Sequence, residues 1–151
     1  MSESYKPLII RATTDYIPSV NQMFVGRSKH LSPVARQYKE DLLRALCNIN
    51  INLVEVYPYL TPDWSFDVEF QFLLNQNFFK RDTDNMNKFT QDVIFGDWLE
   101  INDSNIIRVS AIKYFVPSSP KEQIIAIIKP TEVDVDYYER LYKEQLKSIG
   151  K

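Results

Sequence analysis

An alternation of apolar and polar side chains from Phe66 to Phe72, within the run Phe66 to Leu74, constrains the fold of this chain more than any other feature. The apolar set is Phe66, Val68, Phe70 and Phe72, and the polar set is Asp67, Glu69 and Gln71. Because successive side chains of a β-strand point to opposite faces, one face of this segment is apolar and the other is polar. The alternation predicts a half-buried strand of a sheet that covers a core on one side.

Strands are predicted at four places in the chain: 7–12, 66–74, 106–115 and 123–128. The last two are expected to pair as a hairpin, because the turn-forming segment Val116-Pro117-Ser118-Ser119-Pro120 separates them. The stretch 18–31 contains a proline, a glycine and several basic residues, and is expected to be a long loop.

Helices are predicted at 32–49, from about Thr83 onward, and at 133–149. Ser32 has the character of an N-cap, and Pro33 suits the first helical position because it needs no partner for a backbone N–H. The single cysteine, Cys47, falls within the first helical pattern and is expected to be a buried thiol. Together the patterns predict one compact α/β domain over residues 1–151.

Composition agrees with a folded domain of ordinary size. The chain has 151 residues, of which 44% are hydrophobic, enough for one domain with a real core. No apolar run approaches the roughly 20 residues of a membrane span, and the amino terminus lacks the layout of a signal peptide. We therefore expect no membrane association and a cytoplasmic location.

The charge is weakly acidic overall but unevenly distributed. The net charge is −2, yet residues 1–50 hold seven Lys and Arg against four Asp and Glu. A basic face for nucleic acid can therefore exist within an acidic chain.

Carboxylates and a lysine gather in the segment Lys80 to Lys88. Asp82 and Asp84 are one residue apart, Lys88 follows one helical turn later, and Asp103 stands farther along the chain. If the backbone is extended, Asp82 and Asp84 point to the same side, and in a helix Asp84 and Lys88 share a face. Hard oxygen ligands beside a fixed cation predict a Mg²⁺ site for phosphate chemistry.

A simpler explanation of the same residues stays open. An aspartate before a helix is commonly an N-cap, with a second acid near the positive end of the helix dipole. Asp84 and Lys88 would then form an ordinary ion pair on the helix surface.

Two blocks of sequence together resemble the RusA family of Holliday junction resolvases. The first block is Ile17-Pro18-Ser19-Val20-Asn21-Gln22-Met23-Phe24, with Gly26-Arg27-Ser28-Lys29, Leu31-Ser32-Pro33 and Ala35-Arg36-Gln37-Tyr38 after it. The second is Arg81-Asp82-Thr83-Asp84-Asn85, with Lys88, Asp92 and Asp103 at the family's spacing. The similarity spans residues 17–110. Asn102 stands where the family often has an aspartate, and Ile17 where a proline is usual.

The resemblance implies a RusA-like domain with a mixed sheet and helices, and a homodimer. It implies that Asp82, Asp84 and Asp103 are catalytic metal ligands for Mg²⁺, with Mn²⁺ as a substitute, and that Lys88 is the catalytic cation. Asn85 and Asp92 match the family pattern too, with capping or supporting roles.

Basic side chains near these blocks are candidates for DNA binding. They are Arg27, Lys29, His30, Arg36, Lys80 and Arg81. His30 is the only histidine, so zinc is not expected, because one histidine cannot supply the usual ligand set. Phe78 and Phe79 are candidates for stacking on bases, with the alternative that they complete the core.

The expected function is a Mg²⁺-dependent, structure-selective endodeoxyribonuclease that resolves Holliday junctions and related branched DNA in recombination and repair. Two alternatives remain: another metal-dependent nuclease or a phosphotransferase that uses the same carboxylates, and a non-catalytic DNA-binding domain whose acids only cap a helix.

Overall fold

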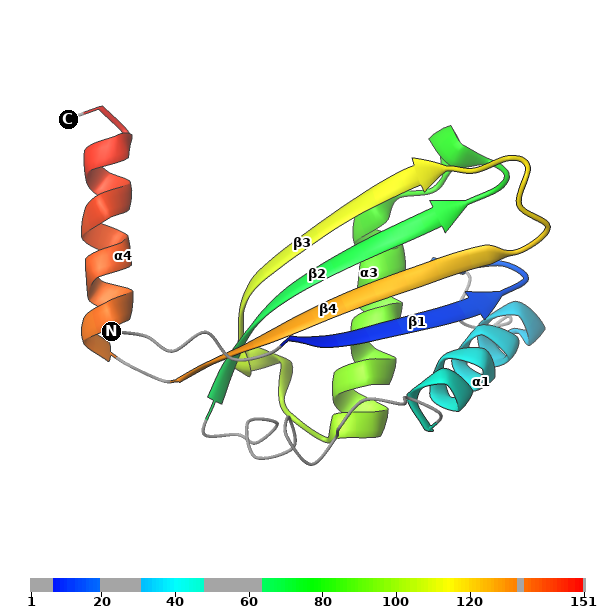
Figure 1. Cartoon of the computed structure of the whole chain (residues 1–151), viewed down its shortest axis with the longest axis horizontal. Helices are drawn as coiled ribbons and strands as arrows, with labels where there is room; N and C mark the ends of the chain where they lie inside the picture. Colours follow the sequence, from blue (N-terminus) through cyan, green and yellow to red (C-terminus); the bar gives the residue numbers. More distant parts are fainter. Residues whose placement is uncertain (1–6, 20–30, 48–63, 133–134, 151) are drawn as a thin grey trace.

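The computed structural model describes residues 7–19, 31–47, 64–132 and 135–150. Figure 1 shows its strands and helices, which in chain order are β1 (Leu8–Thr14), α1 (Pro33–Cys47), β2 (Trp64–Leu74), α3 (Thr83–Gln91), β3 (Ile106–Phe115), β4 (Glu122–Glu132) and α4 (Val135–Ser148). Helix α3 continues directly into a π-helical segment, Asp92–Leu99. Short 3-10 turns lie at Phe78–Lys80 and Asp103–Asn105. The expected alternation of strands and helices is confirmed.

The sheet is mixed, in the order β1-β4-β2-β3. Strand β4 is antiparallel to both β1 and β2, whereas β2 and β3 are parallel. The predicted hairpin between the last two strands is wrong, because β4 lies between β1 and β2. Its side chains Ile124, Ala126 and Ile128 are fully buried, and a central position supplies neighbours on both sides.

Parallel pairing of β2 and β3 determines which chain segments meet at each end of the sheet. Phe66 pairs with Ile106 and Leu74 with Phe115. Helix α3 and its π-helical extension therefore carry the chain back along the sheet, so that β3 starts where β2 starts. Residues just before α3 and residues just before β3 consequently lie toward opposite ends of the sheet.

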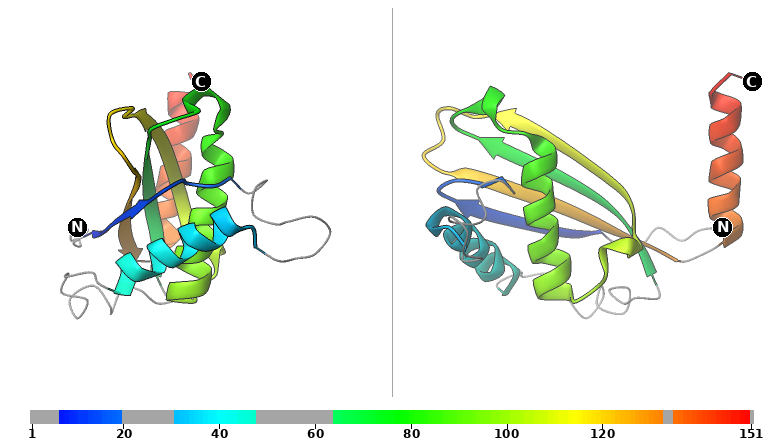
Figure 2. Two further views of the ribbon diagram at one scale, coloured as in Figure 1. Left: turned by 90° about the vertical axis from the view of Figure 1, so that its right-hand side faces the viewer. Right: turned by 180° about the vertical axis from the view of Figure 1, so that it is seen from behind.

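The core lies between one face of the sheet and the helices α1 and α3, which Figure 2 shows on the same side of the sheet. The predicted alternation in β2 is confirmed, since Phe66, Phe70 and Phe72 are fully buried. Tyr38 of α1 meets Thr90 of α3 through a 2.6 Å hydrogen bond between their hydroxyls. Burial raises the pKa of the Tyr38 phenol, so this contact stays uncharged.

The prediction for the amino end of α1 is confirmed, and the prediction for its last residue, Cys47, is wrong. Ser32 Oγ accepts a hydrogen bond from the Ala35 N–H at 3.2 Å, and Pro33 is the first helical residue, as predicted. Cys47 is exposed instead of buried. A helix turns about 100° per residue, so Cys47 points away from the core that Leu46 enters one position earlier.

Helix α4 has apolar side chains that are exposed to solvent. Figure 1 shows α4 to one side of the sheet, and its residues from Glu139 to Ser148 are exposed. Leu141, Tyr142 and Leu146 are among them. None of the helices in the described ranges is long and apolar enough to cross a membrane.

Candidate active site at the start of α3

Asp82 and Asp84 lie together at the amino end of α3. Asp82 is the N-cap residue, with an extended backbone, and its side chain accepts a hydrogen bond from the Asp84 N–H at 2.9 Å. Both residues are exposed. The positive end of the helix dipole favours negative charge here. The capping alternative is therefore realised, and both acids remain exposed to solvent.

Lys88 lies one turn farther along α3 and is exposed. Within the described part of the chain, no ion pair joins it to Asp84. The surface pair expected from the simpler explanation is thus not formed. Two carboxylates with an ammonium one turn beyond the second of them can hold a cation and contact a phosphate.

Asp103 lies elsewhere in the chain, in the turn just before β3. Its neighbour Asn105 donates a hydrogen bond to the Trp64 carbonyl at 2.9 Å, which fixes this turn at the start of β2. Asp82 lies toward the other end of the sheet. The carbonyl of its neighbour Arg81 accepts a hydrogen bond from Lys113, and Lys113 is paired with Phe72 near the end of β2.

The separation between these two places excludes a common metal site within one chain. The six strand steps from Phe66 to Phe72 span about 20 Å. Among the residues that the structure describes, no group of three or more His, Cys, Asp or Glu side chains lies close enough to hold a metal ion. One chain therefore does not bring Asp103 to Asp82 and Asp84, as a single shared ion would require.

Asp103 is instead close enough to Asp92 to act on its charge. Partial desolvation raises the pKa of the Asp92 carboxyl, and the nearby charges of Asp103 and Asp97 raise it further. Asp97 also pairs with Lys39 at 3.1 Å. This end of the helix thus concentrates negative charge away from Asp82.

Arg81 corrects one of the DNA-binding assignments. Its side chain is only 5% exposed, and its guanidinium pairs with Glu122 at 2.5 Å. It also donates to the Ile17 carbonyl and stacks over the Tyr16 ring at 3.9 Å from the centroid. A guanidinium buried and paired in this way is not available to a DNA phosphate, so the expected contact is wrong for this conformation.

Glu122 is the residue that sequence analysis missed. It is fully buried and accepts hydrogen bonds from the backbone N–H groups of Ile17 and Asn75, each at 2.9 Å. A signal for it exists in the sequence, because Glu122 has the same alternation phase as the buried side chains of Ile124 and Ala126. A carboxylate on the inner face of a strand indicates a buried partner.

Lys113 is a second residue that the sequence did not single out. Its ammonium donates to the carbonyls of Phe78 and Arg81 at 2.6 and 2.9 Å, and lies 4.5 Å from the centre of the Phe78 ring. Its side chain therefore spans from β3 to the turn that precedes Asp82.

The remaining candidates for DNA contact differ in position. Lys80 is exposed beside Asp82, and Arg36 is exposed on α1. Phe79 is 92% exposed, whereas Phe78 is half-buried against Phe115. Arg27, Lys29 and His30 lie outside the described residues. The exposed pair Phe79 and Lys80 thus precedes Asp82, with the buried Arg81 between them.

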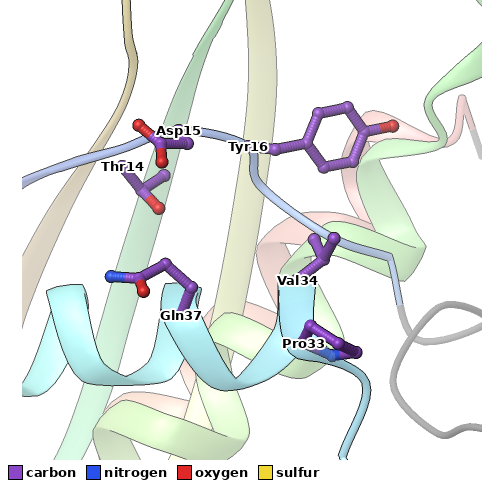
Figure 3. Close-up of a pocket in the computed structure, with 6 residues that line it drawn as sticks. All are labelled: Thr14, Asp15, Tyr16, Pro33, Val34 and Gln37. Carbon is purple, nitrogen blue, oxygen red and sulfur yellow. The ribbon is translucent and has the colours of Figure 1, made fainter.

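A cavity of about 220 Å³ lies between the end of β1 and the first turn of α1 (Figure 3). Its lining consists of Thr14, Asp15, Tyr16, Pro33, Val34 and Gln37. Tyr16 of this lining also lies against the Arg81 guanidinium, whereas Arg81 and Glu122 are not part of the lining. Asp82, Asp84 and Lys88 are not part of its lining.

Comparisons with known proteins do not place the chain in a family. No family model and no curated protein matches it. Among solved structures, an IspF of Plasmodium falciparum in complex with CDP has a TM-score of 0.35 and 12% identity, with 87% of this chain and 100% of that chain covered. The 2C-methyl-D-erythritol 2,4-cyclodiphosphate synthase of Plasmodium vivax has a TM-score of 0.33 and 8% identity, with 83% and 98% covered. Similarity at this level carries no argument about fold or function.

Proposed function

We propose that this protein is a Mg²⁺-dependent, structure-selective endodeoxyribonuclease that cuts branched DNA, with Holliday junctions as its main substrate in recombination and repair. One observation carries the proposal: Asp82 and Asp84 are exposed at the amino end of α3, and Lys88 is exposed one turn beyond Asp84. Their order and spacing are those of the RusA-like motif. A cytoplasmic location is part of the same proposal.

Two carboxylates are sufficient to bind Mg²⁺, which keeps several waters and takes few protein ligands. Mn²⁺ has the same preference for oxygen and is proposed as a substitute. When bound, such an ion supplies activated water and neutralises charge on a phosphate. Lys88 supplies a fixed positive charge, which stabilises the negative charge that develops during phosphodiester hydrolysis.

In a homodimer, Asp103 of one copy can act as a metal ligand together with Asp82 and Asp84 of the other copy. Within one chain Asp103 lies too far from Asp82 to share an ion, so Asp103 can join this site only from a second copy. We propose this arrangement because a two-fold dimer also matches a four-way junction, which needs two coordinated cuts.

Exposed apolar residues support the existence of a partner for β3. This strand is at the edge of the sheet, and its exposed large side chains include Ile107, Ile112, Tyr114 and Phe115. Edge strands with exposed apolar side chains pair readily with another chain. The oligomeric state can be measured directly by sedimentation or light scattering.

Cleavage assays on matched DNA substrates test the function. The wild-type protein should cut four-way junctions in Mg²⁺ faster than flaps or linear duplexes, and should bind junctions without cutting them in Ca²⁺. Preferential cutting of another substrate would favour a different metal-dependent nuclease. Phosphoryl transfer without DNA cutting would favour a phosphotransferase, and junction binding without any reaction would favour a non-catalytic DNA-binding domain.

A further inference from the structure

We propose that the buried pair Arg81 and Glu122, together with Lys113, acts as a positioning device that orients the Asp82 carboxylate toward the substrate. The inference rests on the proposed function and adds to it a set of residues that touch neither DNA nor metal. It assigns Arg81 a role different from the DNA contact expected from the sequence.

The backbone geometry connects Arg81 to Asp82. Both residues have extended backbone angles, with φ and ψ of −110° and 112° for Arg81 and −79° and 124° for Asp82. In an extended chain, successive side chains point to opposite sides. Because the Arg81 side chain is directed into the core, the Asp82 side chain is directed to the surface.

The contacts of Arg81 and Glu122 join three separate segments at this point. The Arg81 guanidinium binds the Ile17 carbonyl and the Glu122 carboxylate, and Glu122 accepts the N–H groups of Ile17 and Asn75. The end of β1, the end of β2 and the start of β4 are therefore tied to the residue before Asp82.

Stability alone does not account for such a pair. Removing two charges from water is costly, and a buried ion pair can often be replaced by neutral residues without loss of stability. What charged and fully hydrogen-bonded groups add is a defined orientation of the segments that they join. The segment that they orient here contains Asp82.

Lys113 holds the same segment from the other side. Its ammonium binds the carbonyls of Phe78 and Arg81, so both the side chain and the backbone of Arg81 are held. These contacts precede the N-cap at Asp82 and fix where α3 begins. The Asp84 N–H, which binds the Asp82 carboxylate, reports directly on this arrangement.

The decisive protein is the double variant Arg81→Met/Glu122→Gln. A single replacement would leave one buried charge without its partner, whereas the double variant is neutral. The introduced glutamine can still accept one backbone N–H, and its amide can donate to the Ile17 carbonyl that Arg81 releases. The melting temperature should fall, because one of the two N–H groups that Glu122 accepts loses its partner, and junction affinity should stay near normal.

Two measurements on this variant separate positioning from packing. Its single-turnover cleavage rate should fall about 10- to 100-fold, the scale of a small misplacement of a catalytic group. Hydrogen exchange at the Asp84 amide should become faster, because the Asp82 carboxylate no longer has a fixed orientation. A folded double variant with wild-type rate and wild-type exchange would overturn the proposal.

A second variant keeps the test valid if the double variant does not fold. Lys113 is only half-buried, so Lys113→Met should fold and retain its contact with Phe78. Its single-turnover cleavage rate should fall about tenfold or more, and hydrogen exchange at the Asp84 amide should become faster. The matched control is Lys121→Met, which removes an exposed ion pair with Asp15 at the same end of the sheet. An Lys113→Met protein that behaves like the Lys121→Met control would refute the role of the device.

Failure of the proposed function gives a different result from failure of this inference. If the wild-type protein cuts no DNA, the proposed function is wrong, and exchange at Asp84 still shows whether the three residues fix the N-cap. If the wild type cuts junctions and the folded variants cut equally well, only the positioning role is wrong.

Discussion

Asp82 accepts the backbone N–H of Asp84 at 2.9 Å, so the residue that caps α3 is also one of the two exposed acids at its amino end. Capping and metal binding are therefore compatible at this position. Asparagine caps a helix about as well as aspartate, so Asp82→Asn removes the charge and keeps the start of the helix. The substitution separates the chemistry of the carboxylate from its structural role.

Mixing two inactive variants should restore cleavage if the site combines residues of two copies. Asp82→Asn and Asp103→Asn should each abolish cutting of a four-way junction in Mg²⁺, with junction binding retained. A mixed dimer of the two has one site without substitutions, because its Asp82 and Asp103 come from different chains. Nicking of a single strand should return after subunit exchange, measured on a labelled junction.

The control for this experiment is a mixture of Asp82→Asn with Asp84→Asn. These two residues belong to the same turn of one chain, so every site in that mixed dimer lacks one of them. Equal recovery in both mixtures, or recovery in neither, would contradict a shared site. Near wild-type cutting by either single variant would remove that residue from the set of ligands.

Replacing Lys88 should affect the reaction more than binding. Lys88→Ala is expected to lower the single-turnover rate by about 10² to 10³, the range for loss of an electrostatic contact in the transition state. Junction affinity should change little, since one exposed charge contributes little to it. Lys143→Ala on α4 is a suitable control, because it also removes an exposed helical lysine. An unchanged rate would leave Lys88 as a surface residue.

Lys80 and Arg81 are adjacent in sequence but should behave differently toward DNA. Lys80 is exposed, so Lys80→Ala should reduce the slope of log K against log salt concentration by about 0.9, the value for one phosphate contact on duplex DNA. The folded variant Arg81→Met/Glu122→Gln should keep the wild-type slope. Equal slopes for wild type and Lys80→Ala, in titrations with labelled junction, would place Lys80 outside the DNA contact.

Local patterns in the sequence predict the strands and helices well, but they do not predict which strands pair with one another. The alternation in β2 and the cap at Ser32 depend on neighbouring residues, and both are confirmed. The position of β4 between β1 and β2 depends on which strands meet across the sheet, which a local pattern does not contain. The hairpin prediction was wrong for this reason.

The same distinction applies to the candidate site. Asp82 and Asp84 lie at the amino end of α3, with Lys88 one turn beyond Asp84, because the spacing of the three residues is local. Asp103 joins them in sequence but not in one folded chain, since its position follows from parallel pairing of β2 with β3. Similarly, Arg81 was expected at the surface because its buried partner, Glu122, lies 41 residues away.

Asp92 should make folding stability depend on pH in a direction opposite to that of a paired carboxylate. Its pKa is raised by desolvation and by the charges of Asp103 and Asp97, so the folded protein holds this proton more tightly than the unfolded chain does. Stability contributed by the group is therefore present below its unfolded pKa, close to the ordinary value of 3.8, and is lost as pH rises through the folded pKa.

At pH 7 the charged carboxylate destabilises the fold, and Asp92→Asn should raise the unfolding free energy by about a few tenths of a kcal/mol, the scale of a screened surface interaction. Urea unfolding at pH 7 and at pH 3 tests this, because the gain should disappear at the lower pH, where the carboxyl is protonated in both states. As a control, Asp103→Asn should lower the Asp92 pKa in an NMR titration by removing one of the two charges. A stability gain of equal size at both pH values would show that packing, and not the charge of Asp92, is responsible.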